Sequence, residues 1–224
     1  DRSAHNVVTI ENPIEYNLEN VTQHAVNEKA DISFASLLRT ALRQDPDILM
    51  VGEVRDTETA EIAMQAAMTG HFVYTTVHAN DTVSASFRLL NLGVESYLIS
   101  SAVSAILAQR LVRRLCPNCR EEYRPTAEDE EVFEKAGMDP ERIDAIYRPS
   151  GCTECRDTGY RGRVGVFELL SFDDELRSLI QQSPTILDIR RLAEKKGIIT
   201  LRRDALEKVV RGVTSVDEAV RVTR

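Results

Sequence analysis

The chain has 224 residues, of which 42% are hydrophobic and 29% charged, so it is long enough for one full domain and a smaller one. Its formal net charge is −8 at pH 7, which argues against a protein that mainly binds a nucleic-acid backbone. The N-terminus does not resemble a signal peptide, and the longest apolar run, over residues 97–112, is interrupted by serines and alanines. We therefore expect no transmembrane helix.

The first hundred residues predict an alternation of strands and helices, which is typical of an α/β layer architecture with a parallel sheet. Short apolar runs predict strands at residues 7–10, 48–51 and 72–77. The run 48–51 is continuous, as in a strand buried on both faces of a sheet, and the strand at 72–77 is also expected to be buried. Asp56 and Asp81 are expected to cap two helices. Apolar residues at helical spacing predict helical faces that include Phe34 to Leu42, Ala60 to Met68 and Leu98 to Leu107.

The composition changes at Cys116, after which the chain is rich in proline, glycine and charge as far as Tyr160. Beyond this segment the last fifty residues are expected to be helical, and Ser215 and Glu218 have the spacing of a capping box. The remaining elements predicted here are acidic helices at 127–136 and 140–146, a strand at 163–170, and helix breaks at Gly197 and Gly212.

All four cysteines fall into two CxxC pairs, Cys116 with Cys119 and Cys152 with Cys155. A tetrahedral zinc ion takes four soft ligands, and two such knuckles supply them, so we interpret the four as a Zn²⁺ site. Two disulfides, a redox-active pair and a nucleic-acid-binding zinc ribbon are the alternatives.

Polar groups follow the expected strands, and parallel sheets present their carboxyl ends to ligands. Glu53 ends the run 48–51, where a carboxylate can orient a water or hold Mg²⁺ through water. Glu11 and Glu15 flank a proline turn and could both face one metal ion, although a solvated loop is the alternative.

Two histidines bracket the expected third strand. His71 precedes it and His78 follows it, so in a regular strand they would point to opposite faces. His78, at the carboxyl end, is the better candidate for a phosphate contact, whereas His71 is more suited to a spacer or an interface. A core histidine is the alternative for each.

Together these segments resemble the ATPases of type II secretion and type IV pilus assembly, and the resemblance covers the whole chain. Residues 9–15 are similar to that family's Asp box, residues 42–56 to its Walker B segment and residues 69–81 to its His box. Residues 108–119 and 159–165 are similar to its zinc-bearing region. The Asp box differs from the common pattern because Asn12 stands where an acid is frequent.

The resemblance implies a RecA-like, parallel-sheet P-loop NTPase core that is only partial here, with a tetracysteine zinc-binding insertion and a C-terminal helical region. We expect the core over residues 1–115, the insertion over 116–160 and the C-terminal region over 161–224. It also implies that Glu53 polarises the attacking water or Mg²⁺, with Glu11 and Glu15 serving the metal and water. The nucleotide-binding residues that it implies are His78, His71 and Arg55.

The cofactors implied are ATP, Mg²⁺ and Zn²⁺, and the partners are further copies in a homo-hexamer and an inner-membrane platform protein, with no nucleic acid. The implied location is cytoplasmic, peripheral on the inner face of the bacterial inner membrane. No GxxxxGK[ST] occurs in the chain, and it does not begin with Met, so we expect a fragment that does not bind ATP well alone. A retraction-type motor and a non-catalytic, zinc-stabilised docking module are the alternative functions.

Overall fold

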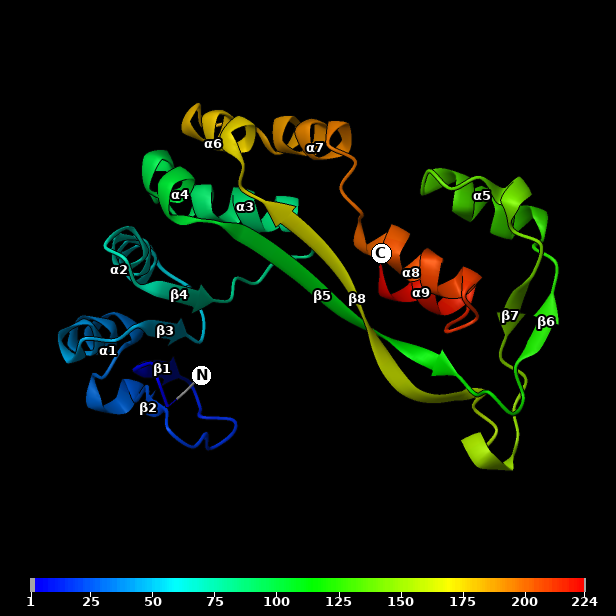
Figure 1. Ribbon diagram of the computed structural model, residues 1–224, viewed down its shortest axis with the longest axis horizontal. Helices are drawn as coiled ribbons and strands as arrows, with labels where there is room; N and C mark the ends of the chain where they lie inside the picture. The colour runs from blue at the N-terminus through cyan, green and yellow to red at the C-terminus, as the bar shows by residue number, and fades with distance from the viewer. Residues whose placement is uncertain (1–2, 224) are drawn as a thin grey trace. The chain divides into compact units, whose positions relative to one another are not determined.

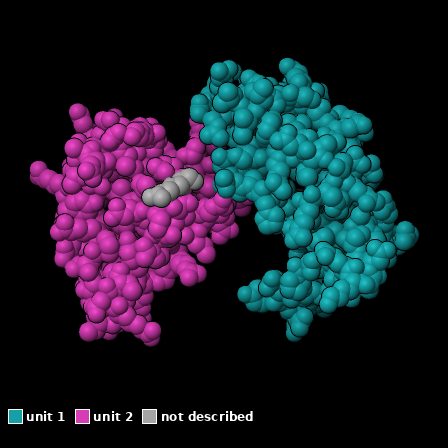
Figure 2. All heavy atoms as spheres, turned by 180° about the vertical axis from the view of Figure 1, so that it is seen from behind, with its two compact units in different colours: residues 1–106, 170–196 teal, residues 107–169, 197–224 magenta. Residues whose placement is uncertain are grey.

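A computed structural model of the protein describes residues 3–223 (Figure 1). The chain divides into two compact units, which Figure 2 colours separately. Unit 1 comprises Asp1–Ile106 and Leu170–Lys196, and unit 2 comprises Leu107–Leu169 and Gly197–Arg224. These units cross the expected boundaries at 115 and 160, and the three-segment domain division stays a prediction. Among the described residues, no helix has both the length and the apolar character needed to span a membrane.

Unit 1 contains a four-stranded parallel sheet, which confirms the α/β class. Its strands lie in the order β2-β1-β3-β4. In the register, Ile10 pairs with Val51 and Val51 pairs with Thr75, so the carboxyl ends of three strands meet at one edge. The strands are β1 (Val7–Glu11), β2 (Thr22–Ala25), β3 (Ile48–Val51) and β4 (Phe72–Thr75).

Helices α1 (Phe34–Ala41) and α2 (Thr57–Met68) pack against the sheet through aliphatic side chains. Leu49 and Val51 on β3 are fully buried in this core, whereas Ile48 and Met50 are only partly buried, so the strand is not buried equally on both faces as the run 48–51 predicted. Asp56 caps α2 as predicted, because its carboxylate accepts a hydrogen bond from the Thr59 N–H at 2.8 Å. The core residues are Val8, Ile10, Leu38, Ala41, Leu49, Val51, Ala63 and Ala66.

Four further helices complete unit 1. Asp81 caps the first of them, α3, by accepting a hydrogen bond from the Ser84 N–H at 2.6 Å, as the sequence predicts. The C-terminal helices are interrupted at Gly197, whose positive φ of 66° suits a residue without a Cβ. The four are α3 (Thr82–Asn91), α4 (Ser96–Ala102), α6 (Asp174–Gln181) and α7 (Ile186–Lys195).

Two expectations about these elements are wrong, and one strand was not expected. The strand after His71 is not buried, since β4 is the edge of the sheet and exposes 58% of Phe72 and 56% of Tyr74. The fourth helix does not reach Leu107, because Val103 is already extended and the chain enters strand β5. Strand β2 was not predicted at all. The deciding factor is the order in which strands pair across a sheet, which local periodicity does not report.

Unit 2 contains most of a two-stranded sheet of β5 (Ala105–Leu115) and β8 (Tyr160–Ser171), together with the antiparallel pair β6 (Glu121–Tyr123) and β7 (Ile146–Arg148). Helix α5 (Ala127–Lys135) forms as expected. The second acidic helix, expected at 140–146, is only the 3-10 turn Pro140–Arg142 followed by β7. Helices α8 (Leu201–Val210) and α9 (Val216–Val222) contribute to the core.

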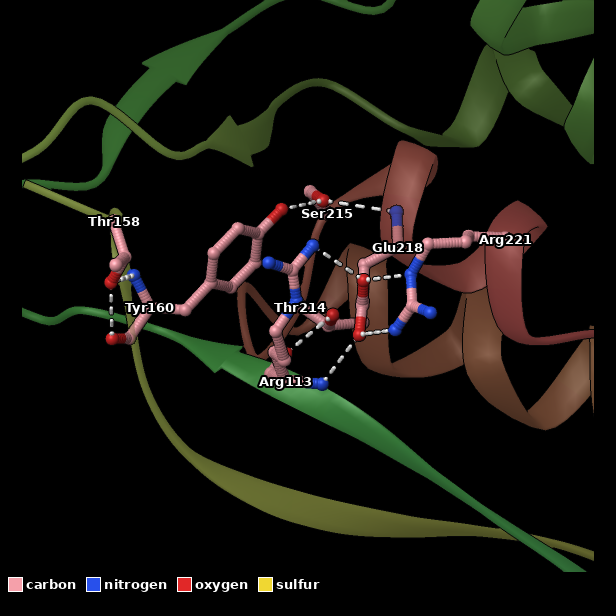
Figure 3. Close-up of polar contacts among 7 residues, drawn as sticks. All are labelled: Arg113, Thr158, Tyr160, Thr214, Ser215, Glu218 and Arg221. Carbon is pink, nitrogen blue, oxygen red and sulfur yellow. Dashed lines mark hydrogen bonds and ion pairs between the residues drawn. The ribbon is translucent and has the colours of Figure 1, made fainter.

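A buried carboxylate joins α9 to β5 in unit 2. Both oxygens of Glu218 accept two hydrogen bonds each, from the Arg113 main chain and guanidinium and from the Arg221 guanidinium, at 2.7 to 2.9 Å (Figure 3). The Tyr160 hydroxyl lies 2.7 Å from the Ser215 hydroxyl, and the Arg113 guanidinium lies 4.1 Å from the centre of the Tyr160 ring. Ser215 accepts a hydrogen bond from the Glu218 N–H, but the reciprocal half of the expected capping box does not form, because the Glu218 side chain is engaged by the two arginines.

Candidate functional site

The carboxyl edge of the parallel sheet in unit 1 gathers several of the predicted site residues. Glu11 is the last residue of β1, Glu53 follows β3 by two residues, and His78 follows β4 by three. Because the three strands are adjacent and parallel, these residues leave the sheet on the same side. The sequence therefore predicted correctly that Glu11, Glu53 and His78 lie at the carboxyl edge of the sheet.

The loop that carries Glu53 is fastened to both neighbouring strands. The Gly52 N–H donates to the Ile10 carbonyl at 2.8 Å, and the Thr76 hydroxyl donates to the Gly52 carbonyl at 2.6 Å. The Val54 N–H in turn donates to the Thr76 carbonyl at 3.0 Å. A Cβ at position 52 would lie 3.0 Å from the Ile10 carbonyl oxygen, so glycine permits this close approach. Glu53 is thus delivered from a fixed backbone.

The side chains of Arg55 and His78 converge on one oxygen of Glu53. Arg55 Nε lies 2.6 Å and His78 Nε2 lies 3.0 Å from Glu53 Oε2. The Glu53 side chain is only 13% exposed, whereas Arg55 is 56% and His78 73% exposed. The hydrogen bond from Arg55, aided by that from His78, lowers the pKa of Glu53 despite its burial. Glu53 is therefore an ionised acid at neutral pH, covered by two more exposed groups.

Glu11 is also held as a carboxylate, by neutral donors. Its Oε1 accepts hydrogen bonds from the Thr9 hydroxyl at 2.6 Å and the Gln23 amide at 2.8 Å. Burial acts to raise the pKa of Glu11, but these hydrogen bonds and one from the Glu15 backbone outweigh it, so the pKa is lowered. The acid is consequently available in its charged form for a cation at the edge of the sheet.

The structure does not bring every candidate together. The side chain of Glu15 is exposed, and this residue meets Glu11 through its backbone N–H and not its carboxylate. His71 lies before β4, at the amino edge of the sheet, where its Nδ1 is 3.0 Å from the Ala66 carbonyl oxygen. His71 and His78 are thus at opposite ends of one strand. A nucleotide contact by His71 stays a prediction without support from its position in unit 1.

Residues that hold the acids were missed from the sequence. Gln23 lies on β2, which no pattern predicted, so its hydrogen bond to Glu11 had no signal in the sequence. Thr9 and Thr76 lie in predicted strands, and alternation along the strand could have placed the Thr9 hydroxyl on the same face as Glu11.

The four cysteines of unit 2 form a compact cluster. Their sulfur atoms all lie within 4.8 Å of one another, and three of the pairs are separated by 3.8 to 3.9 Å. Four thiolates around one tetrahedral Zn²⁺ at the usual bond length place sulfur atoms about 3.8 Å apart. A disulfide needs about 2.05 Å, and all four cysteines are free. The spacing therefore fits a metal-binding tetrad.

Backbone N–H groups turn toward the sulfur atoms of this cluster. Gly151 N donates to Cys119 Sγ at 3.3 Å, and Gly159 N donates to Cys155 Sγ at 3.2 Å. Burial acts to raise the pKa of Cys155, but N–H groups of Cys152 and Gly159 lower it to about 6, while burial raises the pKa of Cys119 to about 12. Such N–H donors to sulfur are the outer contacts that a thiolate–metal site needs.

Comparisons with known proteins show which family this chain is similar to. A family model described as "Type II/IV secretion system protein" matches residues 1–221. A type II secretion system protein E of Pseudomonas aeruginosa is 49% identical over 219 residues, which cover 98% of this chain and 43% of the relative. A type IV pilus assembly ATPase PilB of Thermus thermophilus is 45% identical over 217 residues, covering 96% of this chain and 24% of the relative.

A solved structure supports the fold. The pilus retraction motor PilT, with bound ADP, superposes with a TM-score of 0.68 at 26% sequence identity, covering 97% of this chain and 52% of that one. The chain thus spans less than half the length of the curated relatives named above. The RecA-like, parallel-sheet fold expected from the sequence is confirmed by these likenesses.

Proposed function

This chain belongs to the type II/IV secretion system protein family, and we propose that it is the part of an ATP-hydrolysing secretion or pilus-assembly motor that polarises the attacking water. The observation that carries the proposal is Glu53, an ionised acid at the carboxyl edge of the sheet, held by Arg55 and His78. Relatives named as ATPases and a structural neighbour with bound ADP support a nucleotide as the ligand.

The chemistry proposed is in-line attack of water on the γ-phosphorus of ATP, which breaks the bond to the β–γ bridging oxygen and releases ADP and phosphate. Glu53 accepts a hydrogen bond from that water and orients one of its lone pairs toward phosphorus. Glu11 would hold Mg²⁺, which would neutralise phosphate charge, and Glu15, an exposed residue four positions further on, would serve the same ion. His78, most of whose side chain is exposed, would contact the terminal phosphate. The groups that grip the other phosphates are not supplied by a P-loop motif in this chain.

The cysteine cluster is proposed to hold a structural Zn²⁺ in unit 2. Its four ligands would fill a tetrahedral site completely and leave no position for a substrate, which is typical of structural zinc. Zinc content also bears on the kind of motor. Since the cysteine pairs resemble those of assembly and secretion members, a chain without stoichiometric zinc would favour a retraction-type motor instead.

The assembly proposed is a homo-hexamer in the cytoplasm, docked peripherally on an inner-membrane platform protein. Support for it comes from the membership in a family of secretion and pilus motors, whose relatives cover nearly the whole of this chain. ATP hydrolysis would then drive domain movements around the ring and so transmit work to the membrane machine.

The test is ATP hydrolysis by the product of the complete reading frame that contains this chain, compared with its Glu53→Gln variant. We expect turnover to fall by at least 10²-fold while ATP binding persists, because only the water-orienting carboxylate is lost. Glu58→Gln is the matched control, since Glu58 is an exposed acid of the same segment that pairs with Arg39. Undiminished turnover of Glu53→Gln would remove the catalytic role. Failure of the parent protein to bind or hydrolyse ATP would favour the docking module.

A further inference from the structure

Arg55 was expected among the nucleotide-binding residues, but its contact in the structure is with an acid. Its Nε lies 2.6 Å from Oε2 of Glu53, the same oxygen that His78 approaches at 3.0 Å. The two donors lie in the segments that follow the neighbouring strands β3 and β4. Two donors that converge on one carboxylate oxygen from different directions restrict the rotation of that carboxylate.

The backbone on either side of Arg55 is fixed. Val54 is 2% exposed, and its N–H is bonded to the Thr76 carbonyl at 3.0 Å. Asp56 is the N-cap of α2, and its carboxylate accepts hydrogen bonds from the Thr59 N–H at 2.8 Å and from the Thr59 hydroxyl at 3.0 Å. Arg55 is therefore held between two anchored residues, which keeps its guanidinium within reach of Glu53.

We propose that Arg55 is a positioning residue, which acts on ATP hydrolysis by fixing the carboxylate of Glu53 and not by binding the nucleotide. This inference rests on the proposed function and deepens it. A glutamate has three rotatable side-chain bonds, and a free one populates many rotamers. Held by Arg55, Glu53 keeps the orientation that water requires before the nucleotide arrives, and it stays ionised. A displacement of about 1 Å at a reacting group can lower a rate by about 10²-fold.

The experiment separates kcat from KM in the product of the complete reading frame. We expect Arg55→Gln to lower kcat between 10-fold and 10²-fold and to change KM for ATP by less than threefold. Arg55→Lys should recover part of kcat, because an ammonium group still pairs with the carboxylate. Arg39→Gln is the matched control, since Arg39 also forms an exposed pair with a glutamate, Glu58, at 2.6 Å. It should leave both constants unchanged.

The opposite pattern overturns the inference. If Arg55 binds the nucleotide, Arg55→Gln raises KM for ATP at least tenfold with little change in kcat. Unchanged kcat and KM would also refute the positioning role. Glu53→Gln is measured alongside. If Glu53→Gln still hydrolyses ATP, the proposed function itself fails. If Glu53→Gln is inactive and Arg55→Gln raises KM for ATP, only the positioning role of Arg55 is refuted.

A second measurement needs no nucleotide and uses this chain as it stands. The carboxyl carbon of Glu53 is followed by NMR as the pH is lowered, in the parent and in Arg55→Gln. If the pair exists in solution, the midpoint of the Glu53 titration moves to higher pH in the variant, because its main stabilising donor is gone. An unmoved midpoint would show that Arg55 does not hold the acid. This readout also applies if the longer variant protein proves unstable.

Discussion

Replacing Glu218 with Gln should destabilise unit 2 in a way that depends on pH. The Glu218 side chain is fully buried, and its two oxygens accept four hydrogen bonds from Arg113 and Arg221 (Figure 3). Glutamine keeps the shape of the side chain but loses its charge. One oxygen that accepts hydrogen bonds from the arginines is replaced by an NH₂ group, which can only donate. Removing one member of a buried ion pair leaves the other groups uncompensated.

The size of the effect follows from the pKa of Glu218. Burial acts to raise this pKa, but the hydrogen bonds from Arg221 and Arg113 outweigh burial and lower it from 4.5 to about 2. A difference of one pKa unit corresponds to about 1.4 kcal/mol between the charged and neutral forms. The charged carboxylate therefore stabilises the fold by roughly 3 kcal/mol relative to a neutral group. Because Arg113 and Arg221 are about half exposed, we take about 2–3 kcal/mol as the expected loss in Glu218→Gln.

The direction of the pH dependence is fixed by the lowered pKa. A carboxylate with a lower pKa in the folded state stabilises the fold fully above its unfolded-state value of 4.5. That stabilisation is lost as the pH falls toward about 2, where the folded protein also takes up the proton. The difference between parent and variant should thus be complete at pH 7, about half as large at pH 3, and absent near pH 1.

Hydrogen exchange of α9 and β5, read by mass spectrometry, measures this locally, and urea unfolding followed by circular dichroism measures it for the chain. Hydrogen exchange is measured at pH 7, and urea unfolding is measured at pH 7 and at pH 3. Glu131→Gln is the control, because Glu131 pairs with Lys135 on the exposed surface of α5 in the same unit and should have a small effect. Equal stability of Glu218→Gln and the parent at pH 7, or a difference that does not shrink at pH 3, would show that the charge of Glu218 does not stabilise unit 2.

Two further predictions concern the metal cluster and a helix cap. Removing metal with a chelator should raise hydrogen exchange across residues 116–160 while the parallel sheet of unit 1 stays protected, since zinc is expected to organise only the segment that carries its ligands. Loss of protection throughout the chain would contradict this local role. Asp56→Ala should lower the free energy of urea unfolding by about 1 kcal/mol through loss of the α2 cap, whereas Asp56→Asn should retain most of it, and equal losses in the two variants would argue against capping.

Local signals in the sequence were sufficient for the elements that depend on near neighbours. Asp56 and Asp81 cap their helices as predicted, because a cap needs only a short polar side chain and N–H groups two or three residues away. The apolar run at residues 48–51 identified a core strand for a similar reason, since its composition alone requires burial. The CxxC pairs likewise predicted the cluster, because each pair forms its own turn.

Long-range pairing decided what the sequence left ambiguous. Leu107 lies in a strand and not in a helix, since β5 pairs with β8 from more than forty residues later in the chain. β4 is exposed because the described sheet has no strand beyond it, which its own apolar composition does not reveal. Propensity is a weak guide in such segments, because hydrogen bonding between strands outweighs it.

Local sequence patterns were enough to predict Glu53, Glu11, His78 and the four cysteines as candidate site residues, because their positions relative to strand ends and turns are local facts. Their positions relative to one another came from the folded structure. It placed Arg55 and His78 on the same oxygen of Glu53, left Glu15 exposed, and put His71 at the opposite edge of the sheet. The physical reason is that strand order and register set the distances between side chains far apart in the chain, and no local pattern encodes those distances.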